Sequence, residues 1–136
     1  MKTTITNHLI QKEDLNHHDT LYAGRSAEWL IETAYMAAAN TLQTNSIVAV
    51  KVGEINYFAP VYAGTVLRME GKAVYAGKTS LIVHVVAYVK NQKTHEGFVS
   101  FVKLGEDGRP QPHGTKIETE TEEEKALRER AKKLVC

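Results

Sequence analysis

The fold is decided by residues 16–40, which read NHHDTLYAGRSAEWLIETAYMAAAN. The first part is polar and typical of a loop, and a helix is expected to begin near Ala23 or Gly24. Beyond its first turns the expected helix is apolar on nearly every side, which predicts that the rest of the fold wraps around it. Two carboxylates, Glu28 and Glu32, nevertheless lie in its first half. This contrast predicts that the last turns are enclosed and that the first turns face a site.

Five other segments are expected to form β-strands. One precedes the helix, at residues 3–11, and four β-branched segments with alternating polarity follow it. They are IVAVKVGEINYFA (47–59), TVLRMEGKAVYA (65–76), TSLIVHVVAYVK (79–90) and EGFVSFVKLG (96–105). Short turns between consecutive segments, including one at residues 91–95, favour an antiparallel meander of these four strands.

These elements predict an α+β fold, in which a curved antiparallel sheet of about five strands wraps around one long helix. In the strand at 79–90, alternate residues from Leu81 to Val89 should face the core, and the opposite face should be partly polar. His84 lies on that second face and is interpreted as a structural residue. A sheet of this kind leaves an edge strand unpaired, so a homodimer is expected to complete it.

The composition predicts a single domain over residues 1–136. The chain has 43% hydrophobic and 24% charged residues and a formal net charge of +1, so neither nucleic acid nor a membrane surface is an expected partner. Residues 115–136 are expected to form a charged helical tail, capped by Thr119 or Thr121. Most of its charge is interpreted as a solvated face without a role in chemistry.

The distribution of cysteine and of apolar residues bears on the compartment. The single cysteine, Cys136, allows no disulfide within the chain and favours a reducing environment. The N-terminal segment lacks the apolar run of a signal peptide, and no segment has the ~20 apolar residues of a membrane span. A cytoplasmic protein is therefore expected. His17 and His18 are adjacent loop residues without nearby cysteines, so no metal site is expected.

Several stretches together resemble the hotdog-fold acyl-CoA thioesterases, specifically the acyl-CoA hydrolase group of the brain acyl-CoA hydrolase and YciA type. They are DLNHHDTLYAG (14–24), EWLIETAYMAAA (28–39), INYFAPVYAGTVLRMEGKAVYAGKTSLIVHVVAYV (55–89) and TETEEEKALRERA (119–131). The loop pattern D-x-N-H-H-x-T-L-(F/Y)-x-G and the pattern F-x-x-P…V-x-x-G-(K/R)-T-S are specific in combination. The resemblance covers nearly the whole chain.

The resemblance implies a hotdog fold, in which the sheet surrounds the helix, and a homodimer that often assembles further into a trimer of dimers. It implies hydrolysis of acyl-CoA to a free carboxylic acid and CoA at the dimer interface, with no cofactor other than the CoA of the substrate. In this family the loop asparagine, here Asn16, acts with a helix carboxylate. The amide that corresponds to Gly24 binds the thioester carbonyl oxygen.

A turn of these enzymes contacts the pantetheine or phosphate portion of CoA, and its residues here are Gly77, Lys78, Thr79 and Ser80. A glycine with backbone amides, a cation and two hydroxyls suits a phosphate, although a plain hairpin turn has the same spacing. Phe58 and Pro60 are candidates for the acyl or pantetheine channel, or alternatively for the core of the sheet.

The sequence departs from the family pattern on the helix. Ile31 occupies the position of the catalytic aspartate and cannot ionise. Glu28 lies three residues before it, about 60° away around the helix, whereas Glu32 lies about 100° away. Glu28 is therefore the preferred catalytic carboxylate, and Glu32 the second choice.

Thioester hydrolysis needs a group that activates water or attacks the carbonyl, and donors for the oxyanion that develops. The amide of Gly24 would supply the donor, because the first amides of a helix lack partners and the helix dipole favours negative charge. Glu28 would be the general base or the nucleophile, and Asn16 would orient the water or the carbonyl.

Two other functions remain open from the sequence. The isoleucine in place of the aspartate favours a non-catalytic hotdog module that binds or senses acyl-CoA. A hydratase or dehydratase that uses His17 or His18 is the third possibility, and it is weaker because the surrounding motif is of the thioesterase type.

Overall fold

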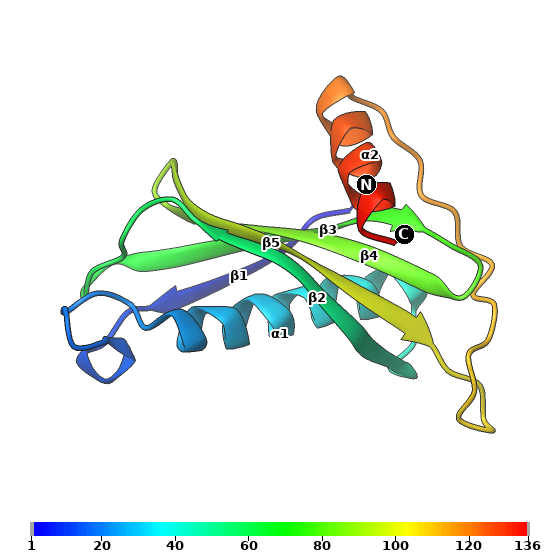
Figure 1. The fold of residues 1–136 in the computed structure, drawn as a ribbon, viewed down its shortest axis with the longest axis horizontal. Helices are drawn as coiled ribbons and strands as arrows, with labels where there is room; N and C mark the ends of the chain where they lie inside the picture. Colours follow the sequence, from blue (N-terminus) through cyan, green and yellow to red (C-terminus); the bar gives the residue numbers. More distant parts are fainter. Residues whose placement is uncertain (1, 136) are drawn as a thin grey trace.

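The structure is a computed structural model that describes residues 2–135, and it contains one curved sheet with a long helix on each side (Figure 1). The strands are β1 (Thr4–Leu9), β2 (Ile47–Tyr57), β3 (Val66–Ala76), β4 (Ser80–Val89) and β5 (Gln92–Lys103). The helices are η1 (Lys12–Asp14), α1 (Ala23–Leu42) and α2 (Glu122–Val135). The predicted α+β fold with a curved antiparallel sheet around α1 is confirmed. Cys136 lies outside the described residues.

The order of the strands in the sheet is β1-β3-β4-β5-β2, and every pair is antiparallel. The predicted four-stranded meander is therefore wrong for β2, which pairs with β5 at one edge and not with β3. Residues 58–65 carry the chain across the end of the sheet, where the amides of Phe58 and Ala59 donate to the carbonyl of Thr94. These long-range bonds replace the tight turn that the sequence suggested.

The turn between β4 and β5 is shorter than expected. Lys90 takes a left-handed conformation (φ 56°), and β5 begins at Gln92. Residues 92–95, predicted to be a turn, therefore belong to the strand. This shift brings His95 into the sheet opposite Tyr57.

The concave face of the sheet holds the main core, because α1 lies across it and contacts all five strands (Figure 1). Leu30, Ala34 and Ala38 of the helix are fully buried. Gly71 lets the helix approach closely, since a Cβ there would lie 3.2 Å from that of Ala37. The helix is enclosed on this side only, because Met36 on its outer side is exposed.

The convex face was predicted to be partly polar, and it does carry polar side chains such as His84 and Glu96, but α2 covers part of it. Val74, Ile82 and Phe98 of the sheet form a second cluster with Ala131 of α2. The predicted solvated tail therefore buries a narrow apolar stripe. No helix among residues 2–135 is both long and apolar enough to cross a membrane.

The predicted cap of the C-terminal helix is confirmed for Thr121. Its hydroxyl accepts a hydrogen bond from the amide of Glu124 at 3.1 Å, and the carboxylate of Glu124 accepts one from the amide of Glu120 at 2.9 Å. Such reciprocal bonds satisfy amides that have no partner within the helix. They fix the point at which α2 begins.

Candidate active site

The loop before α1 is held together by the side chain of Asn16. Its carbonyl oxygen accepts hydrogen bonds from the amides of His18 at 2.8 Å and Thr20 at 3.3 Å, and its amide group donates to the hydroxyl of Thr20 at 3.0 Å. Asn16 therefore shapes the loop in this structure. The catalytic role that the resemblance implies for it stays a prediction.

The start of α1 offers an unused donor. The carbonyl of Tyr22, which precedes the helix, accepts from the amides of Arg25 and Ser26. The amide of Gly24 has no acceptor among the described residues, as expected for a first-turn amide. A Cβ at Gly24 would lie 2.5 Å from the ring of Tyr22, so the glycine also leaves room for that ring.

The two helix carboxylates are both on the surface of a single chain. The side chain of Glu28 is 60% exposed, and its nearest cation is the guanidinium of Arg25 at 4.0 Å. Arg25 also lies 3.4 Å from Asp14, which ties the helix start to η1. Glu32 is exposed, whereas Ile31 is half-buried against the core.

A cleft of about 340 Å³ opens beside the start of α1. Its lining includes Thr20, Ser26, Tyr57, Phe58, Pro60 and His95. Phe58 and Pro60, the predicted channel residues, therefore lie at a cavity. Neither Glu28 nor Glu32 is part of the lining.

His95 is the functional candidate that the sequence did not reveal. Its side chain is 1% exposed, and its Nε2 atom has no hydrogen-bond partner among the described residues. Burial lowers the pKa of His95 to about 4, so the ring is neutral near pH 7. No sequence motif marks it, because its environment is created by strand pairing.

The predicted CoA-binding turn lies at the far end of the sheet. Val66 at the start of β3 pairs with Leu9, just before the Asn16 loop, whereas Ala76 and the following turn lie ten residues further along the strand (Figure 1). At about 3.3 Å per residue the two ends are separated by about 33 Å. One chain therefore does not bring this turn together with the start of α1.

The segment after β5 packs against this turn. The amide of His113 donates to the carbonyl of Lys78 at 3.2 Å, and its Nε2 atom lies 2.8 Å from the carbonyl oxygen of Ser80. A cavity of about 450 Å³ lies between the turn and this segment, and its lining includes Gly77, Lys78, Lys116 and Arg128. Cations from three parts of the chain therefore gather beside the turn.

Comparison with known proteins places the chain in a family. A family model described as "Thioesterase superfamily" matches residues 18–95 of the 136 residues, which is more than half of the chain. The chain belongs to the thioesterase superfamily. Membership in this superfamily agrees with the resemblance that the loop and turn motifs carried.

Proteins named as acyl-CoA thioester hydrolases resemble the chain over most of its length. The cytosolic acyl coenzyme A thioester hydrolase of Mus musculus is 26% identical over 133 residues, which is 92% of this chain and 34% of the mouse protein. The chain thus spans about a third of the mammalian relatives it matches. The acyl-CoA thioester hydrolase YkhA of Bacillus subtilis, described as uncharacterised, is 26% identical over 82% of this chain and 67% of its own length.

Solved thioesterase structures have the same fold. An apo-hexameric acyl-CoA thioesterase superimposes with a TM-score of 0.90 at 28% identity, covering 98% of this chain and 88% of that one. An acyl-CoA hydrolase from Staphylococcus aureus, solved with butyryl coenzyme A and coenzyme A, gives a TM-score of 0.89 at 22% identity, covering 98% and 84%. The predicted hotdog fold is confirmed.

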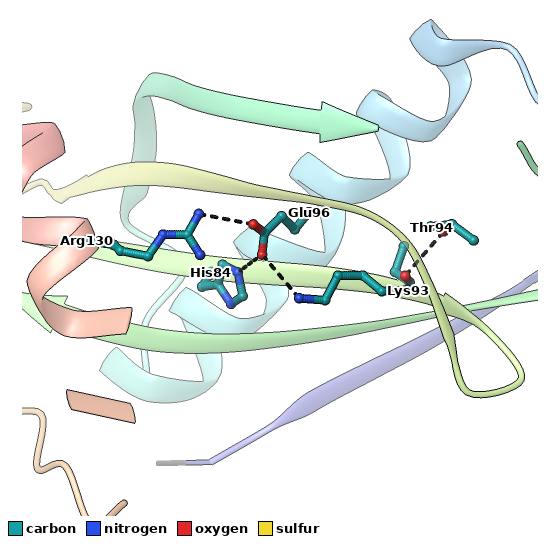
Figure 2. A network of polar contacts seen from close by, with 6 residues as sticks. His84, Lys93, Thr94, Glu96 and Arg130 are labelled. Atoms are coloured by element: carbon teal, nitrogen blue, oxygen red, sulfur yellow. Dashed lines mark hydrogen bonds and ion pairs between the residues drawn. The ribbon is translucent and has the colours of Figure 1, made fainter. Parts of the chain in front are cut away.

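Away from the cleft, a cluster of polar side chains lies on the convex face of the sheet, beside α2 (Figure 2). His84 Nε2 lies 2.8 Å from Glu96, and Arg130 of α2 donates to the other carboxylate oxygen at 3.0 Å. Burial alone would raise the pKa of Glu96, but the hydrogen bonds from His84 and Arg130 lower it. Burial lowers the pKa of His84 despite that bond, so a neutral imidazole donates to a carboxylate. The cluster satisfies its own polar groups, in agreement with a structural role for His84.

Proposed function

We propose that this chain is an acyl-CoA thioester hydrolase, which converts an acyl-CoA and water to a carboxylic acid and CoA. The observation that carries the proposal is the amide of Gly24 in the first turn of α1, which has no acceptor among the described residues, in a member of the thioesterase superfamily. Ser26 of the same turn lines a cleft. The names of the relatives support the same reaction class. The reaction requires no cofactor other than the CoA of the substrate.

The amide of Gly24 is assigned to the carbonyl oxygen of the thioester. As water attacks the carbonyl carbon, negative charge develops on this oxygen, and a free amide at the positive end of a helix dipole stabilises it. Losing one such donor typically costs about 3 kcal/mol of transition-state stabilisation. Collapse of the intermediate breaks the carbon–sulfur bond and releases CoA as the thiol.

Glu28 is assigned as the carboxylate that activates the water, with Glu32 as the second choice and Asn16 as the group that orients the water or the carbonyl. Glu28 lies one turn into α1 from Gly24, near Arg25. In one chain its exposure is high, so a partner that covers the start of α1 is needed to strengthen its electrostatic effect.

A homodimer is proposed to complete this site. The edge strand β2 presents Val48, Val50 and Val52, each at least 42% exposed, and an apolar edge of this kind invites pairing with a second copy. The partner would bring its turn at residues 77–80 toward the cleft that one chain leaves incomplete. The hexameric structural relatives favour a trimer of dimers.

The remaining partner and compartment predictions follow the same relatives. The mouse relative is named as cytosolic, which supports a cytoplasmic location for this chain. A net charge of +1 supports a small-molecule substrate over nucleic acid or a membrane surface.

The alternative is a hotdog module that binds acyl-CoA without turnover. Ile31 favours it, because the helix position of the family's catalytic aspartate carries a side chain that cannot ionise. Under this alternative the cleft and the turn would still bind CoA, but no thiol would be released.

The test is release of free thiol from a panel of short, medium and long acyl-CoAs by the purified protein. Glu28→Gln is expected to lower kcat at least about 100-fold, as for loss of a general base. Asn16→Ala and Glu32→Gln rank the other assignments, and Glu129→Gln on the exposed side of α2 is the matched control. Saturable acyl-CoA binding without thiol release from any member of the panel would establish the binding module instead.

A further inference from the structure

The ring of His95 is held rigidly inside the fold. On β5 it pairs with Tyr57 on one neighbouring strand and with Ala87 on the other. The ring of Tyr57 stacks on it with centroids 5.3 Å apart and an angle of 23° between the planes. Strand pairing and stacking together fix where the ring nitrogens point.

The hydrogen bonds of Thr94 favour one tautomer of the His95 ring. The hydroxyl of Thr94 donates to the carbonyl of Ala87 at 3.2 Å, and it lies 3.1 Å from His95 Nδ1. A hydroxyl has one proton, so after that donation it can only accept from Nδ1–H. Because the ring is neutral, Nε2 then carries a free lone pair.

Residues 2–135 place no hydrogen-bond donor at this lone pair. Three side-chain hydroxyls line the cleft together with His95, and they belong to Thr20, Ser26 and Tyr57. Ser26 and Tyr57 both donate to the carbonyl of Ala23, at 3.1 Å each, and Thr20 exchanges hydrogen bonds with Asn16. Buried acceptors are rarely left without a partner. A molecule that enters the cleft could supply the donor for His95.

We infer that His95 is a ligand-contacting residue of the cleft, whose Nε2 accepts a hydrogen bond from an O–H or N–H group of the bound acyl-CoA complex. The inference rests on the proposed function and deepens it. Two groups of that complex have the required chemistry, namely the attacking water and the amides of the pantetheine arm. In either position His95 accepts a hydrogen bond and neither gains nor loses a covalent bond.

The direct test uses nitrogen NMR of protein labelled at histidine, with a non-hydrolysable thioether analogue of acyl-CoA as the ligand. Without ligand, Nε2 of His95 should give the resonance of an unprotonated nitrogen that accepts no hydrogen bond. Saturating analogue should move that resonance toward the hydrogen-bonded range. His84, which lies on the opposite face of the sheet with its partner in place, should not respond.

Kinetics of two variants provide the second arm. His95→Leu removes the acceptor and is expected to lower kcat/KM about tenfold, whereas His95→Gln retains an acceptor and should recover part of that loss. A loss confined to kcat identifies the attacking water as the donor, and a rise confined to KM identifies the pantetheine amide. His84→Gln is the matched control for disturbing a buried histidine.

The inference is overturned if the His95 resonance ignores the analogue and His95→Leu keeps wild-type kcat and KM. It is also overturned if His84→Gln lowers kcat/KM by the same factor. A third contrary result would be an Nε2 atom that is already hydrogen-bonded in the free protein, since a second copy would then supply the donor. If the protein releases thiol but neither the His95 resonance nor the kinetics of His95→Leu change, this inference is rejected and the proposed hydrolase activity stands. If the analogue shifts the His95 resonance but no acyl-CoA releases thiol, the proposed hydrolase activity is rejected and the hydrogen bond between His95 and the ligand stands.

Discussion

Two histidines are buried in adjacent strands of the same sheet, and their surroundings differ in kind. His84 on β4 faces α2, where Glu96 accepts a hydrogen bond from its ring and a second one from Arg130. His95 on β5 lines the cleft, and one of its nitrogens has no partner within residues 2–135. The first environment is closed by the chain itself, and the second is completed only by something the chain binds. Burial alone therefore does not distinguish structural from functional histidines, but the state of their hydrogen bonds does.

The two environments also differ in how they couple to stability. In the cluster of His84, Glu96 and Arg130, each polar group offsets the desolvation of another. Removing one of them therefore leaves the desolvation of the others uncompensated. Around His95 the free-energy cost of desolvation is already present in the folded protein, because no described residue donates to its buried Nε2 atom. Mutations should therefore destabilise the closed cluster and have their main effect on function at the open one.

The largest effect is expected from breaking the closed cluster with Glu96→Leu. The change leaves the buried His84 without its acceptor and releases Arg130 from the sheet, so the free energy of unfolding should fall by about 3 kcal/mol. Urea denaturation measures it, with Glu129→Leu on the exposed side of α2 as the control. A loss as small as that of the control would mean that the cluster does not hold α2 in place.

The pH dependence of stability should come next in size and should depend on His95. Its folded pKa of about 4 lies below the ordinary 6.5, so between these values the unfolded chain binds a proton that the folded chain does not. Stability should therefore fall as the pH falls, and the contribution of this one group amounts to about 2 kcal/mol between pH 6.5 and 5.

His95→Leu isolates this contribution. His84 and Glu96 titrate in the variant and in the wild type alike, so the difference between their two stability profiles reports His95. The variant should lose about 2 kcal/mol less than the wild type over this range, measured by urea denaturation at several pH values. Parallel profiles would show that His95 is not desolvated as the structure indicates.

A smaller effect is expected from removing the cap of α2. Thr121→Ala removes the hydroxyl that caps the first turn of α2, and the free energy of unfolding should fall by about 1 kcal/mol. Thr121→Ser retains the hydroxyl and serves as the control in the same denaturation experiment. Equal losses in both variants would assign the effect to the methyl group.

The smallest effect should belong to Lys93, the exposed member of the cluster in Figure 2. Its amine lies 3.9 Å from Glu96 and its side chain is 48% exposed, so the pair is screened by solvent. Lys93→Gln should change the free energy of unfolding by about 0.5 kcal/mol or less. A loss comparable to that of Glu96→Leu would mean that the cluster depends on this cation rather than on Arg130.

The elements of the fold could be predicted from the sequence, because each follows a local pattern. The helical spacing of apolar residues placed the start of α1 correctly, and alternation placed most strand bounds within a few residues. The position of β2 in the sheet could not be predicted, because its pairing with β5 is a long-range choice that no turn residue records. The packing of α2 was missed because only a narrow stripe, Leu127, Ala131 and Leu134, is apolar.

The candidate site divides in the same way. Gly24, Phe58 and Pro60 lie at the start of α1 or at the cleft beside it, where motif reasoning put them. The turn at 77–80 lies at the far end of the sheet, and only the proposed homodimer would bring it to a cleft. His95 could not be predicted, because its free lone pair results from the combined positions of Thr94, Tyr57 and Ala87.

The exposed edge of β2 has a consequence for handling the protein. An unpaired edge strand with an apolar surface can pair with a strand of another molecule, and such pairing leads to aggregation. If the proposed homodimer covers β2, a subunit separated by dilution would carry this surface without protection. Storage losses should then rise as the solution becomes more dilute, opposite to the usual behaviour of aggregating proteins. Preparations kept concentrated should therefore last longest.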